Sequence, residues 1–121
     1  MSLLFEPTRI VPLVVKNRFV HSATYECMAG TDGEVTDELV NRYRNLARGE
    51  VGLIIPGYLY VLPGGKAIGR QTGIHHDGLV PGLRKIVDVV HEEGGRIAFQ
   101  LAHGGRQSPK KVTGQPPLAP S

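Results

Sequence analysis

Residues near position 100 combine an apolar segment with polar groups that could bind a ligand. Residues 96–101 (RIAFQL) read as a strand that carries Gln100 near its end, and the turn His-Gly-Gly-Arg follows directly. Strands of α/β barrels place ligand-binding groups at their carboxyl ends in this way. Gln100 is therefore the first candidate for a ligand-binding residue. His103 and Arg106 can instead brace the turn, with Arg106 pairing a carboxylate and His103 capping a loop.

Two other segments carry residue types that suggest a metal or phosphate site. His75, His76 and Asp77 are adjacent, but neighbouring histidines in an extended turn point in different directions, and no further ligand has suitable spacing. We therefore expect no metal, and we assign Asp77 as the N-cap of a helix. Residues 63–66 (PGGK) lack the Gly-x-x-x-x-Gly-Lys-Ser/Thr pattern of a phosphate loop and are expected to form a turn.

The elements that would position these groups alternate along the chain. Thr36 is expected to cap a helix that ends at Gly49, because apolar side chains at positions 39, 43, 46 and 47 share one helical face. A second helix follows Asp77 with apolar residues at 79, 83, 86, 87 and 90, and it ends at Gly94-Gly95. Strands are expected at residues 16–23, 51–55 and 96–101, after a short irregular hairpin at 10–15.

This order predicts an α/β fold with a parallel sheet and right-handed crossovers. The run at 51–55 is apolar without alternation, which is typical of a strand buried on both faces. Because a closed eight-fold barrel needs roughly 250 residues, the chain is either a small open α/β domain or the first part of a barrel. Residues 107–121 contain four prolines and no periodic pattern, and are expected to form a loop tail.

Composition argues against several classes of protein. The 121 residues carry a net charge of +3 without a long basic run, and they include three Phe, four Tyr and no Trp, so nucleic-acid binding is not expected. The single cysteine, Cys27, forms no intramolecular disulfide and fits a reducing compartment. The N-terminus does not resemble a secretory signal, and no apolar run approaches the ~20 residues of a membrane span. We therefore expect a cytoplasmic protein that does not bind a membrane.

Three blocks of the chain together resemble the N-terminal part of the old yellow enzyme family, the NADH:flavin oxidoreductases. The blocks are residues 16–20 (KNRFV), 52–55 (GLII) and 100–106 (QLAHGGR), and their spacing also fits. The resemblance extends over the whole chain, although the chain covers only about a third of a barrel of this kind. It implies that residues 1–121 form about three βα units of an FMN-binding (β/α)8 TIM barrel, preceded by a short hairpin.

The resemblance also implies a cofactor and a reaction. Such enzymes accept hydride from NADH or NADPH onto FMN and pass it to an activated alkene. The first strand would place small side chains under the flavin ring, the second strand would reach its pyrimidine end, and an amide would pair with N3 and O2, since an amide both donates and accepts. The implied FMN contacts are Ser22, Ala23, Thr24, Tyr25, Gly57, Tyr58 and Gln100.

Two positions depart from the family pattern. Many members place Thr or Cys where a hydrogen bond to flavin O4 tunes its potential. Here that position falls on Tyr25 or, with a slip of one residue, on Thr24. Cys27 lies two residues beyond Tyr25 and is not assigned this role. Ala23 stands where many members have Pro.

The resemblance places other necessary groups on later strands, among them the residues that hold the substrate carbonyl and the phosphate. It therefore implies an ene-reductase with a small-molecule substrate in the parent protein, which we expect to be a homo-oligomer, whereas the fragment alone is expected to be inactive. The alternative is a non-catalytic α/β module that self-associates or complements a separate C-terminal half, because an open sheet of three strands leaves edges and an apolar face uncovered.

Overall fold

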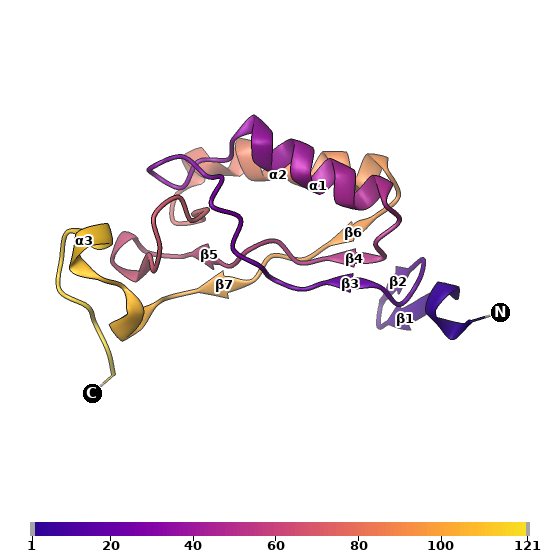
Figure 1. Cartoon of the computed structure of the whole chain (residues 1–121), viewed down its shortest axis with the longest axis horizontal. Coiled ribbons are helices and arrows are strands. Elements are labelled where there is room, and N and C mark those ends of the chain that lie inside the picture. Colours follow the sequence, from indigo (N-terminus) through magenta and orange to yellow (C-terminus); the bar gives the residue numbers. More distant parts are fainter. Residues whose placement is uncertain (1, 121) are drawn as a thin grey trace.

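A parallel sheet of three strands, covered on one face by two helices, forms the centre of the molecule (Figure 1). The computed structural model describes residues 2–120. Strands β3 (Val20–His21), β4 (Leu53–Ile54) and β6 (Arg96–Ile97) lie in the order β3-β4-β6. Both pairs are parallel, so the carboxyl ends of all three strands lie at the same edge of the sheet.

Helix α1 (Asp37–Arg48) begins at the predicted cap. The Thr36 hydroxyl accepts a hydrogen bond from the Leu39 amide at 3.4 Å, as an N-cap does. The end of the helix differs from the prediction. Gly49 has φ −73°, and the left-handed conformation falls on Glu50, at φ +70°. The carbonyl of Glu50 is held in this turn by the side chain of Asn17.

Helix α2 (Val80–Glu92) follows a 3-10 turn, η3 (Asp77–Leu79), and its predicted cap is wrong by one residue. His76, not Asp77, caps the turn, because its Nδ1 accepts a hydrogen bond from the Gly78 amide at 3.1 Å. His76 has extended backbone, which is the conformation of a capping residue. Asp77 lies inside the turn.

The apolar faces of α1 and α2 pack on the sheet and on each other. Nine residues from both helices, from β4 and from the loop before α1 make up the core, and their exposed fractions are at most 8%. They are Ala29, Leu39, Val40, Tyr43, Ala47, Ile54, Ile86, Val89 and Val90. The apolar side chains that recur with helical periodicity in the sequence therefore form the buried faces of both helices.

The strands are shorter than predicted, and a second parallel pair continues them. Strand β5 (Leu59–Tyr60) pairs with β7 (Leu101–Ala102) beyond the ends of β4 and β6 (Figure 1). The predicted third strand at 96–101 is thus interrupted at 98–100. The backbone hydrogen bonds between the strands are interrupted beside these residues. Pro56 has no amide proton to donate, and the amide of Gly57 donates to the side chain of Glu26 instead.

The two ends of the chain lie at opposite ends of the strands (Figure 1). The turn η1 (Leu3–Phe5) and the antiparallel pair β1 (Thr8–Ile10) and β2 (Leu13–Val15) lie at the amino end. The tail expected at 107–121 is not all loop, because η4 (Gly105–Gln107) and a helical turn, α3 (Lys110–Thr113), occur there, and α3 packs on η2 (Pro63–Gly65). No helix within residues 2–120 is long and apolar enough to cross a membrane.

Candidate functional site

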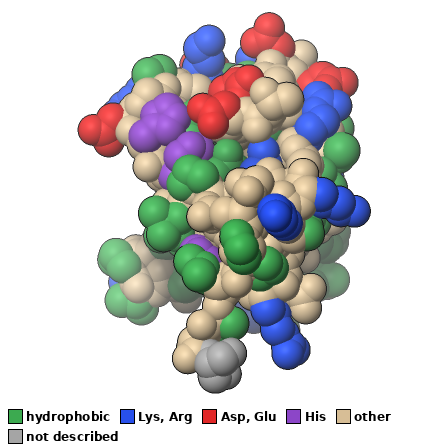
Figure 2. Space-filling view, turned by 90° about the vertical axis from the view of Figure 1, so that its left-hand side faces the viewer, with side chains coloured by type: hydrophobic (Ala, Val, Ile, Leu, Met, Phe, Trp, Pro, Cys, Tyr) green, Lys and Arg blue, Asp and Glu red, His purple; other side chains and the backbone are tan. Residues whose placement is uncertain are grey.

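Three segments leave the sheet side by side at the carboxyl ends of its parallel strands. Residues 22–25 follow β3, residues 56–58 follow β4, and residues 98–100 follow β6. Backbone hydrogen bonds keep the second and third segments in register, from Ala98 to the Ile54 carbonyl at 3.0 Å and from Leu59 to the Gln100 carbonyl at 2.8 Å. The fold therefore brings together the predicted site segments. Figure 2 views the molecule from this end.

The side-chain amide of Gln100 lies at this edge. Its side chain is exposed, and within residues 2–120 it forms no hydrogen bond, so both its donor and its acceptor are available to a ligand. Ser22 and Thr24 are also exposed, and the Thr24 hydroxyl donates to the Ser22 carbonyl at 3.1 Å. The edge thus offers polar groups from the first and third strands.

Tyr25 turns its hydroxyl to a neighbouring loop. The phenol donates a hydrogen bond to the Gly69 carbonyl. Burial, followed by a hydrogen bond with Cys27, raises the pKa of Tyr25 to about 12, so the hydroxyl is protonated and remains a donor at neutral pH. Cys27 is exposed and adopts φ +59°.

Glu26 is a site residue that sequence reasoning missed. Its Oε1 accepts hydrogen bonds from the Tyr43 hydroxyl and from the Gly57 amide, the latter at 2.5 Å. Burial, and then the hydrogen bond to Glu26, raise the pKa of Tyr43 well above its usual range, so the phenol donates. Gly57 follows Glu26 by 31 positions, and no local pattern in the sequence pairs them.

Gln71 was also missed, and it positions Tyr58. Gln71 is 2% exposed, and its Nε2 donates to the Tyr58 carbonyl at 3.1 Å. Its Oε1 accepts from the amides of Ala67 at 2.9 Å and Ile68 at 3.4 Å. One buried amide therefore ties the loop at 66–71 to the end of β4.

The two adjacent histidines have a third potential ligand, contrary to the prediction. The ligand atoms of Asp32, His75 and His76 lie within 4.8 Å of one another, because the glycine-rich loop before α1 folds over them. However, Nδ1 of His76 accepts a hydrogen bond from the Gly78 amide, which stabilises the start of η3. A neutral imidazole that binds a metal ion through one nitrogen carries its proton on the other. Nε2 of His76, 3.6 Å from Asp32 Oδ2, therefore cannot bind a metal ion while this hydrogen bond is kept.

The His-Gly-Gly-Arg turn braces a neighbouring loop. The Gly104 amide donates to the Gly65 carbonyl at 2.8 Å, and His103 Nδ1 accepts from the Gly105 amide at 3.0 Å, as a loop cap does. Arg106 is exposed and forms no ion pair within residues 2–120, so the expected carboxylate partner is not found there. Residues 63–66 form a turn, and Lys66 Nζ donates to the Thr31 carbonyl at 2.7 Å.

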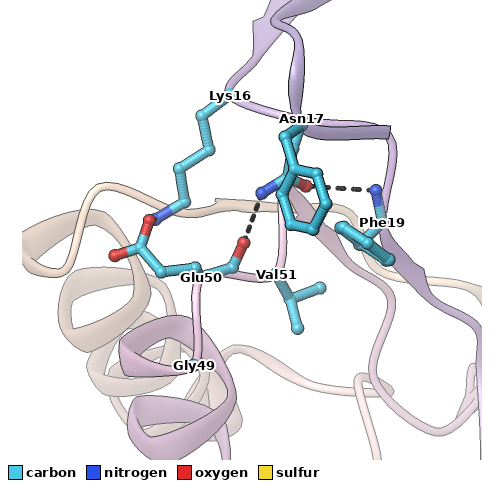
Figure 3. A pocket seen from close by; sticks show the side chains of 7 residues that line it. Lys16, Asn17, Phe19, Gly49, Glu50 and Val51 are labelled. Carbon is cyan, nitrogen blue, oxygen red and sulfur yellow. Dashed lines mark hydrogen bonds and ion pairs between the residues drawn. The ribbon is translucent and has the colours of Figure 1, made fainter. Parts of the chain in front are cut away.

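A hollow of about 540 Å³ lies at the opposite, amino end of the strands (Figure 3). Its polar groups already have partners. Lys16 pairs with Glu50 at 3.0 Å, and Asn17 bonds the Glu50 carbonyl at 2.5 Å and the Phe19 amide at 3.1 Å. The hollow therefore connects the start of β3 to the end of α1 and offers no free side-chain group of Lys16, Asn17 or Glu50 to a ligand.

Comparison with known proteins places the whole chain in one group. A family model described as the NADH:flavin oxidoreductase / NADH oxidase family matches residues 3–121. A "Metal reductase" of Desulforamulus reducens is 40% identical over 121 residues, which are 100% of this chain and 18% of that protein.

Solved structures agree with this match. An old yellow enzyme homologue from Zymomonas mobilis superposes with a TM-score of 0.92 at 32% identity, over 99% of this chain and 33% of that one. Morphinone reductase in complex with tetrahydroNAD gives a TM-score of 0.89 at 32% identity, over 100% of this chain and 33% of that one. The chain thus spans a third or less of the length of these relatives.

Proposed function

Because the chain belongs to the NADH:flavin oxidoreductase / NADH oxidase family, that of the old yellow enzyme homologues, we propose that it supplies the first part of an FMN site. The complete enzyme would transfer hydride from NADH or NADPH through FMN to an activated alkene. The residues of this chain would bind and orient the flavin ring, and the chemistry of hydride transfer would belong to the cofactor.

The observation that carries the proposal is the exposed side-chain amide of Gln100, which lies beyond the carboxyl end of β6 and directly before β7. The pyrimidine end of a flavin presents an imide N–H next to carbonyl oxygens, and an amide with a free donor and a free acceptor matches that edge. Ligands of α/β barrels bind at this end of the strands. The available polar groups therefore fit FMN.

Further contacts would come from the other two segments. We assign Ser22, Ala23 and Thr24 to the face of the ring, because they follow β3 with small side chains that leave room for a flat ligand. Gly57 and Tyr58 would approach the pyrimidine end from β4. Tyr25 is the last proposed contact, and we assign to its hydroxyl the tuning of the reduction potential of the flavin.

The test is a titration of the chain with FMN, followed by quenching of flavin fluorescence. We expect saturable binding by the unaltered chain, and binding at least about tenfold weaker for Gln100→Ala, because the loss of a paired hydrogen bond costs about that factor. Gln107→Ala is the matched control, since Gln107 is exposed and of the same type, and its affinity should not change. Equal affinities of Gln100→Ala and the unaltered chain would refute the assignment.

A further inference from the structure

The carboxylate of Glu26 joins two of the segments that would contact FMN. Glu26 directly follows Tyr25, and its Oε1 accepts the amide of Gly57, which directly precedes Tyr58. The same oxygen accepts the hydroxyl of Tyr43. Since Tyr43 is 1% exposed and belongs to the core, the carboxylate anchors both segments to α1.

The local backbone is shaped around this carboxylate. A Cβ atom on Gly57 would lie 2.8 Å from Glu26 Cδ, closer than two carbon atoms normally approach, so a side chain at position 57 would displace the carboxylate. Cys27 adopts φ +59° immediately after Glu26, a conformation that L-residues seldom adopt. Two backbone positions, Cys27 and Gly57, therefore have special conformational or steric requirements next to the Glu26 carboxylate. The carboxylate lies between the segments that contain them.

Glu26 also brings a negative charge to the site. Within residues 2–120 it forms no ion pair, and its two donors are a phenol and a backbone amide, which are neutral. A negative charge close to a flavin opposes the negative charge that the ring gains on reduction. Replacement of the carboxylate by an amide removes that charge and keeps an oxygen acceptor for the hydrogen bonds.

We propose that Glu26 is a positioning residue that fixes the separation of residues 22–25 from residues 57–58, and that its charge lowers the reduction potential of the bound flavin. This inference rests on the proposed FMN site. Glu26 acts through Gly57 and through the backbone of its own segment.

The experiment compares Glu26→Ala and Glu26→Gln in the full chain loaded with FMN. We expect Glu26→Ala to bind FMN about tenfold more weakly, because the Gly57 amide loses its acceptor. Glu26→Gln should bind within about twofold of the unaltered chain and should show a higher reduction potential. Glu92→Gln is the matched control, because Glu92 is exposed at the end of α2, and it should change neither quantity.

Three outcomes separate this proposal from simpler ones. Unchanged FMN affinity in Glu26→Ala would refute the positioning role. An unchanged potential in Glu26→Gln would refute the role of the charge, and a lower melting temperature with neither change would make Glu26 purely structural. If the unaltered chain itself binds no FMN, the proposed function fails, and the role of Glu26 fails with it.

Discussion

Asn17 donates from Nδ2 to the carbonyl of Glu50 at 2.5 Å, across 33 positions of the sequence (Figure 3). Its Oδ1 accepts the Phe19 amide at 3.1 Å, and Asn17 is 6% exposed. Glu50 adopts the left-handed conformation, at φ +70°. One buried side chain therefore fixes both the entry into β3 and the turn that leads from α1 into β4.

Replacement of Asn17 by Ala should lower the free energy of unfolding by about 2–3 kcal/mol, because two hydrogen bonds are lost and their backbone partners stay partly buried. Urea unfolding measures the change. Lys16→Ala is the control, since it removes a partly exposed ion pair with Glu50 that contributes at most about 1 kcal/mol. A loss for Asn17→Ala no larger than that for Lys16→Ala would contradict the role of this joint.

Gln71 should affect both stability and cofactor binding. In Gln71→Met the volume is kept, but the Tyr58 carbonyl and the amides of Ala67 and Ile68 lose their partner, so we expect a loss of about 2–3 kcal/mol in the free energy of unfolding. FMN affinity should also fall, since Tyr58 is then held less firmly. Gln107→Met, at an exposed position, should change neither quantity. If FMN affinity stays unchanged in Gln71→Met, Tyr58 does not need this anchor.

The helices and the parallel order could be predicted because their signals are local. Thr36 caps α1, as predicted, and the apolar positions 39, 43 and 47 lie within this helix and are buried. These patterns depend on neighbours three or four positions apart. Gln100 was predicted to end its strand, whereas it lies between β6 and β7 and directly precedes Leu101 of β7.

The remaining features depend on contacts between distant residues. The strand break after β4 arises partly because Gly57 bonds Glu26 instead of a neighbouring strand. The left-handed residue at the end of α1 is Glu50 rather than Gly49, because Asn17 captures the Glu50 carbonyl. Asp32 reaches His75 and His76 only once the loop before α1 has folded over them. Spacing along the sequence gives no signal for such pairs.

The free energy of unfolding should decrease as the pH falls, because of His75. Burial, followed by the nearby His76, lowers the pKa of His75 below its ordinary value of 6.5. The unfolded chain then binds more protons than the folded one, so this contribution to stability is complete above pH 6.5 and is lost as the pH falls through the lowered pKa.

His75→Phe should keep the stacking on Tyr60, whose ring centroid lies 4.7 Å away, and should remove this titration. We expect the free energy of unfolding to decrease less between pH 7.5 and pH 5 than in the unaltered chain, by up to about 1.4 kcal/mol per pH unit. Chemical unfolding at several pH values measures it. His91→Gln, at an exposed position, is the control and should leave the pH dependence of the free energy of unfolding in place. If this pH dependence is also unchanged in His75→Phe, it arises from other groups.

Tyr25 offers a test of how the chain aligns with FMN. Its hydroxyl is protonated at neutral pH, because its pKa is raised to about 12, and it donates to Gly69 in the structure described here. If this donor moves to flavin O4 when FMN binds, Tyr25→Phe should change the reduction potential and the visible absorption of bound FMN, with an affinity within about threefold of the unaltered chain. Thr24→Val removes the hydroxyl one position earlier and should change neither. The reverse result, an effect of Thr24→Val alone, would assign the tuning to Thr24.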